Sequence, residues 1–104
     1  MYTLDQKVLP HPDAVDTPLD GNELVLLHLG SKNYYSLNGT GLRIWQGLKE
    51  GLSLREISRR LQQEFGIDSA RGDQSVLRLA DELSREGLVR LEETATPRTG
   101  SDDG

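Results

Sequence analysis

Few side chains of this 104-residue chain belong to types that carry catalytic or metal chemistry. The absence of cysteine excludes disulfides, thiolate metal sites and cysteine nucleophiles. The two histidines, His11 and His28, lack the close spacing typical of metal ligands, and no serine, histidine and aspartate follow a triad order. The glycine-rich segment Gly39-Thr40-Gly41 is not followed by the lysine of a phosphate-binding loop. We therefore expect no enzymatic activity, no cofactor and no metal.

The segment Tyr34–Trp45 changes its periodicity partway along. Tyr34–Leu37 is aromatic and apolar, which favours a strand, and it follows the turn cluster Gly30–Asn33. Beyond it the apolar residues recur at helical spacing. Asn38 and Thr40 stand at the join, where we expect their side-chain oxygens to cap the new helix. A strand that leads directly into a helix, with no catalytic residue between them, indicates a binding surface.

Two further strands are predicted before this segment. Ala14–Leu19 reads as an edge strand because Pro18 cannot donate a ladder hydrogen bond, and the turn Asp20-Gly21 follows it. Leu24–Leu29 is apolar on both faces, so we expect the central strand of a sheet that is covered on both sides. With Tyr34–Leu37, these strands form a three-stranded antiparallel meander.

Three helices and a short strand are predicted after the sheet. The helices cover Thr40–Lys49, a segment from the capping box Ser53–Glu56 to about Phe65, and a segment from Asp68 or Ser69 to Gly87. The strand is Leu88–Leu91. The sequence therefore predicts an α+β, winged-helix-like fold, with a three-stranded antiparallel sheet followed by three helices.

Charge and composition narrow the classes of partner. The net charge of −5 and the pI of about 4.9 argue against a general affinity for nucleic acid. No apolar run approaches the roughly 20 residues that cross a membrane, and no signal peptide is evident, so we expect a cytoplasmic protein. We expect residues 1–12 to form a flexible arm, residues 13–91 to form the folded domain, and residues 92–104 to be a disordered tail.

Several short motifs lie one after another between about Leu19 and Leu91. They are Asp20-Gly21 with Val25-Leu26-Leu27, Tyr34–Asn38 with Gly41 and Ile44-Trp45, Leu54, Glu56, Ile57 and Leu61, and finally Val76-Leu77, Leu79-Ala80, Leu83 and Gly87-Leu88. Together they resemble the PqqD family, the peptide-recognition elements of pathways that make ribosomally synthesised, post-translationally modified peptides (RiPPs). The family often has Phe where this chain has Leu79.

The resemblance implies a non-catalytic protein that binds the leader of a precursor peptide and presents its core to modifying enzymes. The leader would add as a strand beside the third predicted strand, in a cleft that the third helix closes. A chain with little beyond this domain is similar to stand-alone members, which partner a leader peptidase in lasso-peptide pathways. Other stand-alone members serve radical-SAM maturases as peptide chaperones.

The predicted peptide site has two walls. The first is the strand edge Asn33, Tyr34, Tyr35, Ser36 and Leu37, whose free backbone groups are a template for another strand. One tyrosine would pack on the core and the other would face the peptide.

The second wall is a stripe on the third helix, next to the stripe expected to face the core. The core-facing stripe is Val76, Leu79 and Leu83. The peptide-facing stripe is Asp73, Leu77, Ala80, Asp81 and Ser84. Ala80 would permit close approach of a strand, Leu77 would line a pocket, and Asp73 and Asp81 would pair with basic leader residues. Alternatively, Leu77 packs on the domain's own sheet and the acids form a solvated helix face.

Two other classes of function remain open at this stage. A winged-helix regulator would read DNA with the third helix, but Ser69–Glu86 carries three arginines against four acids, a poor match to phosphates. A homodimer, formed through the strand edge or by exchange of the N-terminal arm, is compatible with leader binding.

Overall fold

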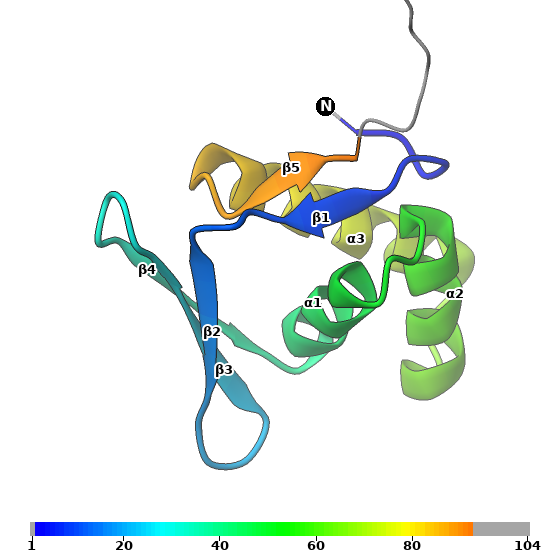
Figure 1. The fold of residues 1–104 in the computed structure, drawn as a ribbon. Helices are drawn as coiled ribbons and strands as arrows, with labels where there is room; N and C mark the ends of the chain where they lie inside the picture. The colour runs from blue at the N-terminus through cyan, green and yellow to red at the C-terminus, as the bar shows by residue number, and fades with distance from the viewer. Residues whose placement is uncertain (1, 93–104) are drawn as a thin grey trace, which may run out of the picture.

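The computed structural model describes residues 2–92, which form an α+β domain. Its elements are β1 (Val8–Pro10), β2 (Ala14–Pro18), β3 (Glu23–His28), β4 (Tyr34–Asn38), α1 (Thr40–Lys49), α2 (Leu54–Phe65), α3 (Ser69–Arg85) and β5 (Val89–Leu91). The predicted order of three antiparallel strands followed by three helices is confirmed (Figure 1). A second, two-stranded sheet of β1 and β5 is added to it.

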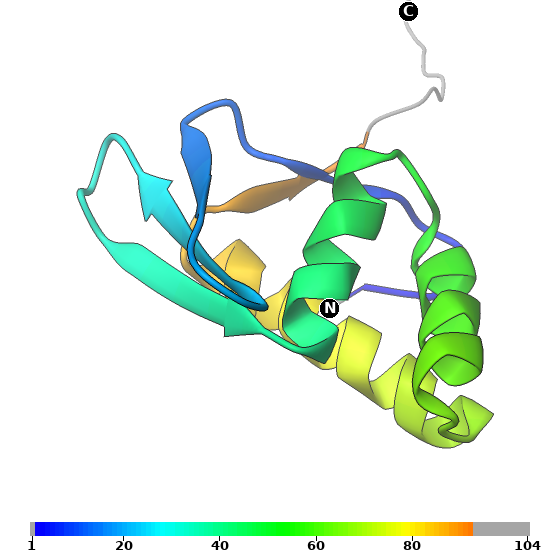
Figure 2. The same ribbon diagram turned by 90° about the horizontal axis from the view of Figure 1, so that it is seen from below.

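The three-stranded sheet has the strand order β2-β3-β4, and its helices lie on one side of it (Figure 2). Directly paired residues point to the same face. The pairs Leu24 with Leu37 and Leu26 with Tyr35 therefore share the inner face, where Leu24, Leu26 and Leu37 are buried. This inner face meets the core that the helices complete.

The opposite, outer face of this sheet is not covered by a helix, contrary to the prediction of a sheet covered on both sides. One row across it joins Val15, Leu27 and Tyr34, and Val25 lies in the next row. Val15 is 41% exposed and Tyr34 is 74% exposed. The prediction failed because apolar residues on a strand can be covered by the same chain or by a binding partner, and the sequence pattern does not distinguish the two.

The predicted capping box of α2 is present, and α3 begins at one of its two predicted positions with a side-chain cap. The side chain of Ser53 accepts from the Glu56 N–H, and Glu56 Oε1 accepts from the Ser53 N–H at 2.8 Å, which completes the capping box of α2. Asp68 caps α3 by accepting from the Arg71 N–H. At α1 the predicted caps Asn38 and Thr40 are wrong, because Gly39 occupies the N-cap position at φ 53° without a side-chain bond. The chain turns there through a backbone conformation that glycine adopts without a steric penalty.

The N-terminal residues are part of the folded domain, so the predicted flexible arm is wrong for the described residues 2–12. β1 pairs antiparallel with β5, and Val8 is fully buried. The Tyr2 hydroxyl donates to Ser84 Oγ at 2.9 Å, and the carbonyls of Leu4 and Gln6 accept from the first turn of α2. A three-residue strand is too short for a periodic pattern to reveal it. Of the predicted tail, residues 93–104 lie outside the described part of the chain.

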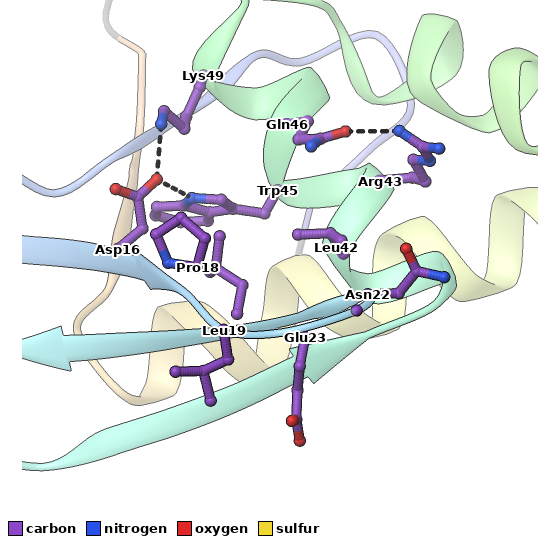
Figure 3. Close-up of a pocket in the computed structure, with 12 residues that line it drawn as sticks. Asp16, Pro18, Leu19, Asn22, Glu23, Leu42, Arg43, Trp45, Gln46 and Lys49 are labelled. Atoms are coloured by element: carbon purple, nitrogen blue, oxygen red, sulfur yellow. Dashed lines mark hydrogen bonds and ion pairs between the residues drawn. The ribbon is translucent and has the colours of Figure 1, made fainter.

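A polar contact joins β2 to α1 beside a pocket of about 380 Å³, shown in Figure 3. Asp16 Oδ2 accepts from Lys49 Nζ at 2.6 Å and from Trp45 Nε1 at 2.9 Å. Trp45 itself is 1% exposed and belongs to the core. The contact fixes the edge strand of the sheet to the helix that follows β4.

The Asp16 contact predicts a pH-dependent contribution to stability. Its hydrogen bonds from Lys49, first, and then from Trp45 hold the pKa of Asp16 below its usual value. A carboxyl whose pKa is lowered by folding stabilises the protein above its unfolded pKa of about 3.9, and this contribution disappears as the pH falls through the folded value. We therefore expect the advantage of wild type over Asp16→Asn in urea denaturation to decrease below about pH 5. Salt should reduce the advantage, because Lys49 is half exposed. An advantage independent of pH would contradict the assignment.

Within residues 2–92, none of the helices is both long and apolar enough to span a lipid bilayer.

Candidate functional site

The outer edge of β4 carries backbone groups that point away from the sheet. His28 N–H donates to the Asn33 carbonyl at 2.9 Å, which fixes the alternation of the β3–β4 ladder. Tyr35 and Leu37 then bond to β3, whereas Tyr34, Ser36 and Asn38 turn their N–H and C=O groups outward. Within the described residues β4 pairs with β3 alone. This edge is therefore open to one further strand, as predicted.

The other edge of the sheet is less suited to strand addition. The same alternation, fixed by the Leu29 N–H bond to the Asp13 carbonyl, turns Ala14, Asp16 and Pro18 outward on β2. Pro18 has no N–H to donate, and the Ala14 N–H already donates to the His11 carbonyl at 2.9 Å. The sheet thus presents one open edge, at β4, and one protected edge.

The inner side of the β4 edge faces one flank of α3. The Tyr35 hydroxyl donates to Glu82 Oε1 at 2.5 Å, which joins the strand to the helix. Leu37 and Leu79 converge on Gly41, because a Cβ built there would lie 3.2 Å from Leu37 Cδ2 and 3.8 Å from Leu79 Cδ2. Glycine at position 41 keeps this corner narrow enough for both leucines to reach it.

A pocket of about 240 Å³ opens between the first turn of α1 and this flank of α3. Its lining residues are Thr40, Gly41, Ile44, Ser75, Arg78, Leu79 and Glu82. Ile44 is buried and Leu79 is half-buried, whereas Arg78 is exposed at the rim. The pocket therefore combines an apolar floor with hydroxyl and charged groups at its mouth, which suits side chains of an extended peptide.

The hydrogen bond to Glu82 also sets the ionisation of the Tyr35 phenol. The bond to this carboxylate, first, and then burial raise the pKa of Tyr35 to about 12. The phenol is therefore a hydrogen-bond donor throughout the physiological range, and Glu82 is its acceptor. Tyr35 is the tyrosine that faces the helices, while Tyr34 points to the outer face.

The other predicted strand residues are placed by the same alternation. Asn33 precedes β4 and bonds to β3, the Ser36 side chain is exposed on the outer face, and Leu37 is buried at 4% exposure. The strand segment is thus a continuous edge in which Tyr35 and Leu37 supply the inner surface.

The structure places the predicted peptide-facing stripe of α3 on the flank of the helix that faces α2 and the N-terminal segment. Asp73 accepts from Ser58 Oγ of α2 at 2.6 Å, and Ser84 accepts from Tyr2 of the N-terminal segment. Ala80 is fully buried, and Leu77 is half-buried against the core. Asp81 pairs with Arg85 on the same helix. These five residues do not line the space beside β4.

The α3 residues that do face the β4 edge were missed as a set. Leu79 was predicted to face the core, and it packs against the core while also lining the pocket. Ser75, Arg78 and Glu82 were not singled out. Helical periodicity groups residues into stripes, but it identifies the stripe next to β4 only if the centre of the buried face of α3 is known. That centre includes Ala80, whose small side chain gives a weak apolar signal but permits close packing.

These features define the chain as a winged-helix-like binding domain with one open strand edge and a helix-lined pocket beside it. The model of the family described as "Coenzyme PQQ synthesis protein D (PqqD)" matches residues 23–89, more than half of the chain. The chain belongs to the PqqD family, as its sequence motifs predicted.

Solved structures agree with the family assignment. The chain is 30% identical to the protein in "TbiB1 in Complex with the TbiA(beta) Leader Peptide". The match covers 85% of this chain and 99% of that chain, and the two superpose with a TM-score of 0.73. It shares its fold with "Lasso peptide synthetase B1 complexed with the leader peptide", at 24% identity, 80% and 96% coverage and a TM-score of 0.74. Among the curated proteins, no match was found.

Proposed function

We propose that this protein binds the leader of a RiPP precursor peptide by strand addition to β4 and has no catalytic activity of its own. The observation that carries the proposal is the open edge at Tyr34, Ser36 and Asn38 beside the Leu79 flank of α3. The 30%-identical protein TbiB1, whose structure contains a leader peptide, supports it.

Backbone pairing alone would give only part of the affinity. Each new hydrogen bond contributes about 0.5–1.5 kcal/mol net, and ordering a flexible leader opposes binding. A micromolar complex requires about 8 kcal/mol, so side chains of the leader must add the rest. The apolar surface of Leu37, Leu79 and the Ile44 pocket floor is placed to receive them.

Strand geometry divides the leader side chains into two sets. Alternate residues of an added strand point to opposite faces of the sheet. One set would face α3, where Leu79 offers apolar contact and Glu82 offers a carboxylate. The other set would extend the outer face beyond Tyr34. The loaded protein would therefore present an outer surface that the free protein lacks.

This enlarged outer surface supports delivery of the bound leader to a processing enzyme. Val15 and Tyr34 are exposed on the uncovered face, and a fourth strand would widen it. Apolar patches of this kind mark protein interaction sites. We favour a leader peptidase of a lasso-peptide pathway as the enzyme, with a radical-SAM maturase as the alternative, and we place the complex in the cytoplasm.

DNA binding is disfavoured by how the arginines of the helices are paired. On α3, Arg78 pairs with Glu82 and Arg85 with Asp81. On α2, Arg60 pairs with Glu50 across to the end of α1. Cations that are neutralised by neighbouring acids release few counterions on meeting phosphates. The helix that a winged-helix regulator would place in the groove is therefore poorly suited to it.

The test of the proposal is a fluorescence-polarisation titration with the labelled leader of the precursor peptide encoded beside this gene. We expect saturable binding with a dissociation constant in the micromolar range or tighter. Absence of saturable binding below about 100 μM would contradict leader recognition. A salt-sensitive gel shift with the promoter region would instead favour a DNA-binding function.

A pair of matched Leu→Gln substitutions tests which flank of α3 faces the leader. Leu79→Gln should weaken leader binding about tenfold, because burial of a leucine contributes about 1.5–3 kcal/mol and part of this is lost with a polar tip. Leu77→Gln is the matched control, since Leu77 lies on the opposite flank, and it should change the affinity less than about twofold. Circular dichroism checks that both variants are folded. A larger loss of leader affinity for Leu77→Gln than for Leu79→Gln would show that the leader binds the flank of α3 expected from the sequence.

A further inference from the structure

The fold brings the only two histidines of the chain together at one end of the three-stranded sheet. His11 lies between β1 and β2, and His28 ends β3. Their ring centroids are 5.4 Å apart, with the planes tilted by 34°. The Asp13 carboxylate completes the group, and one ligand atom from each of the three residues lies within 4.8 Å of the others. Sixteen residues lie between the two histidines in sequence, so spacing along the chain gave no signal for this cluster.

The backbone around the cluster is held by hydrogen bonds that do not involve the three side chains. His11 N–H donates to the Leu88 carbonyl and His28 N–H to the Asn33 carbonyl, each at 2.9 Å. The Asp13 carbonyl accepts from the Leu29 N–H at the same distance. The side chains of His11 and Asp13 thus project from fixed positions in the β1–β2 connection, and that of His28 from the end of β3. A site on fixed backbone is better organised for a ligand than one on a free loop.

We propose that His11, Asp13 and His28 form a binding site for one borderline divalent transition metal ion, with zinc as the representative. Two imidazoles and one carboxylate are ligand types that zinc takes readily, and a solvent molecule would supply the fourth position. Bonds of about 2.0–2.1 Å at tetrahedral angles place ligand atoms roughly 3.4 Å apart. Ligand atoms that now lie within 4.8 Å of one another would therefore have to approach by at most roughly 1.4 Å. None of the three proposed ligands lies on β4, the strand proposed to bind the leader.

Hydrogen bonds to the two rings limit the expected affinity. His28 Nδ1 accepts from the N–H groups of Gly30 and Ser31, at 3.1 and 3.2 Å, and His11 Nδ1 accepts from the Asp13 N–H at 3.0 Å. A metal on Nδ1 displaces these donors, and a metal on Nε2 moves the ring proton onto Nδ1, where it meets the same donors. Both routes break the three bonds. Because the bonds are exposed, their N–H groups pass to water, and we expect micromolar rather than nanomolar binding.

The composition of the chain removes the strongest competing ligands from the test. No cysteine competes for the metal, and no histidine exists outside the cluster. Untagged protein is titrated with Zn²⁺ against a chromophoric chelator. We expect one Zn²⁺ per chain, binding that weakens as the pH falls, and no competition from Mg²⁺, which prefers oxygen ligands. His11→Gln and His28→Gln should each weaken Zn²⁺ binding roughly tenfold or more, and Asp13→Asn should weaken it less.

Two controls separate this cluster from adventitious binding to the acidic surface. Asp20→Asn removes an exposed acid from the turn after β2 and should leave Zn²⁺ affinity unchanged. In wild type, amide NMR signals of Asp13, Gly30 and Ser31 should shift on zinc addition, because their bonds to the rings are lost. This readout does not depend on the folding of any variant. Binding that survives both histidine substitutions, zinc-induced shifts confined to other residues, or no saturable binding below about 100 μM Zn²⁺ would overturn the proposal.

Discussion

Replacement of Ser36 by proline is expected to abolish leader binding while leaving the domain folded. The Ser36 N–H points away from the sheet, so its loss breaks no bond of the β3–β4 ladder. Proline is tolerated on an edge strand when its missing N–H faces outward, and the extended Tyr35 before it has a backbone conformation compatible with a following proline.

The same substitution removes the centre of the template that the leader would use. A proline at position 36 has no N–H to donate, so one carbonyl of the leader is left without a hydrogen bond. The proline ring also occupies the space of the removed hydrogen. An unsatisfied buried acceptor costs about 1–3 kcal/mol, and the steric block adds to it. We expect at least about 30-fold weaker binding in the fluorescence-polarisation titration, equivalent to about 2 kcal/mol.

Ser36→Ala is the control for this result because it keeps the backbone N–H. The Ser36 side chain is exposed on the outer face and does not contact the inner surface. Its affinity for the leader should stay within about twofold of wild type. Equal losses for both variants would assign recognition to the hydroxyl. Unchanged binding by a folded proline variant would show that the leader does not add to β4.

Elements defined by local signals were predictable from the sequence. The capping box at Ser53 and the N-cap at Asp68 depend on residues three apart, and both are present in the structure. The β4 edge followed from a short aromatic strand bounded by turn residues. These signals need no knowledge of what the rest of the chain contributes, so a single sequence carries them.

Features set by distant contacts were not predictable in the same way. Val8 and Leu91 are paired across almost the whole length of the chain, and a three-residue strand at each end gives no periodic pattern. The flank of α3 depends on where the N-terminal segment packs, since Tyr2 covers the Ser84 side and leaves the Leu79 side to face β4. Because the first segment was expected to be a free arm, the flank of α3 that it covers was assigned to the peptide.

Replacement of Trp45 by alanine is expected to lower the free energy of unfolding by about 3–5 kcal/mol, the range for large aromatic residues in a core. Trp45 is 1% exposed, and its indole both fills the space between α1 and the sheet and donates to Asp16. Domains of this size have total stabilities of about 5–15 kcal/mol, so the loss is a large part of the whole. Trp45→Phe should cost less, because the ring body remains and Asp16 keeps its bond to Lys49.

The unfolding of these variants should be followed by circular dichroism in urea, because Trp45 is the only tryptophan and its removal eliminates the tryptophan fluorescence signal. Tyr34→Ala is the matched control: it also removes a large aromatic, but one that is 74% exposed, and should change stability by less than about 0.5 kcal/mol. Similar small losses for the two alanine variants would contradict the core role of Trp45.

Because Gly39 alone separates β4 from α1, loosening α1 also loosens the strand edge. Leader affinity of Trp45→Ala should therefore fall even under conditions where most molecules remain folded, whereas that of Trp45→Phe should stay near wild type.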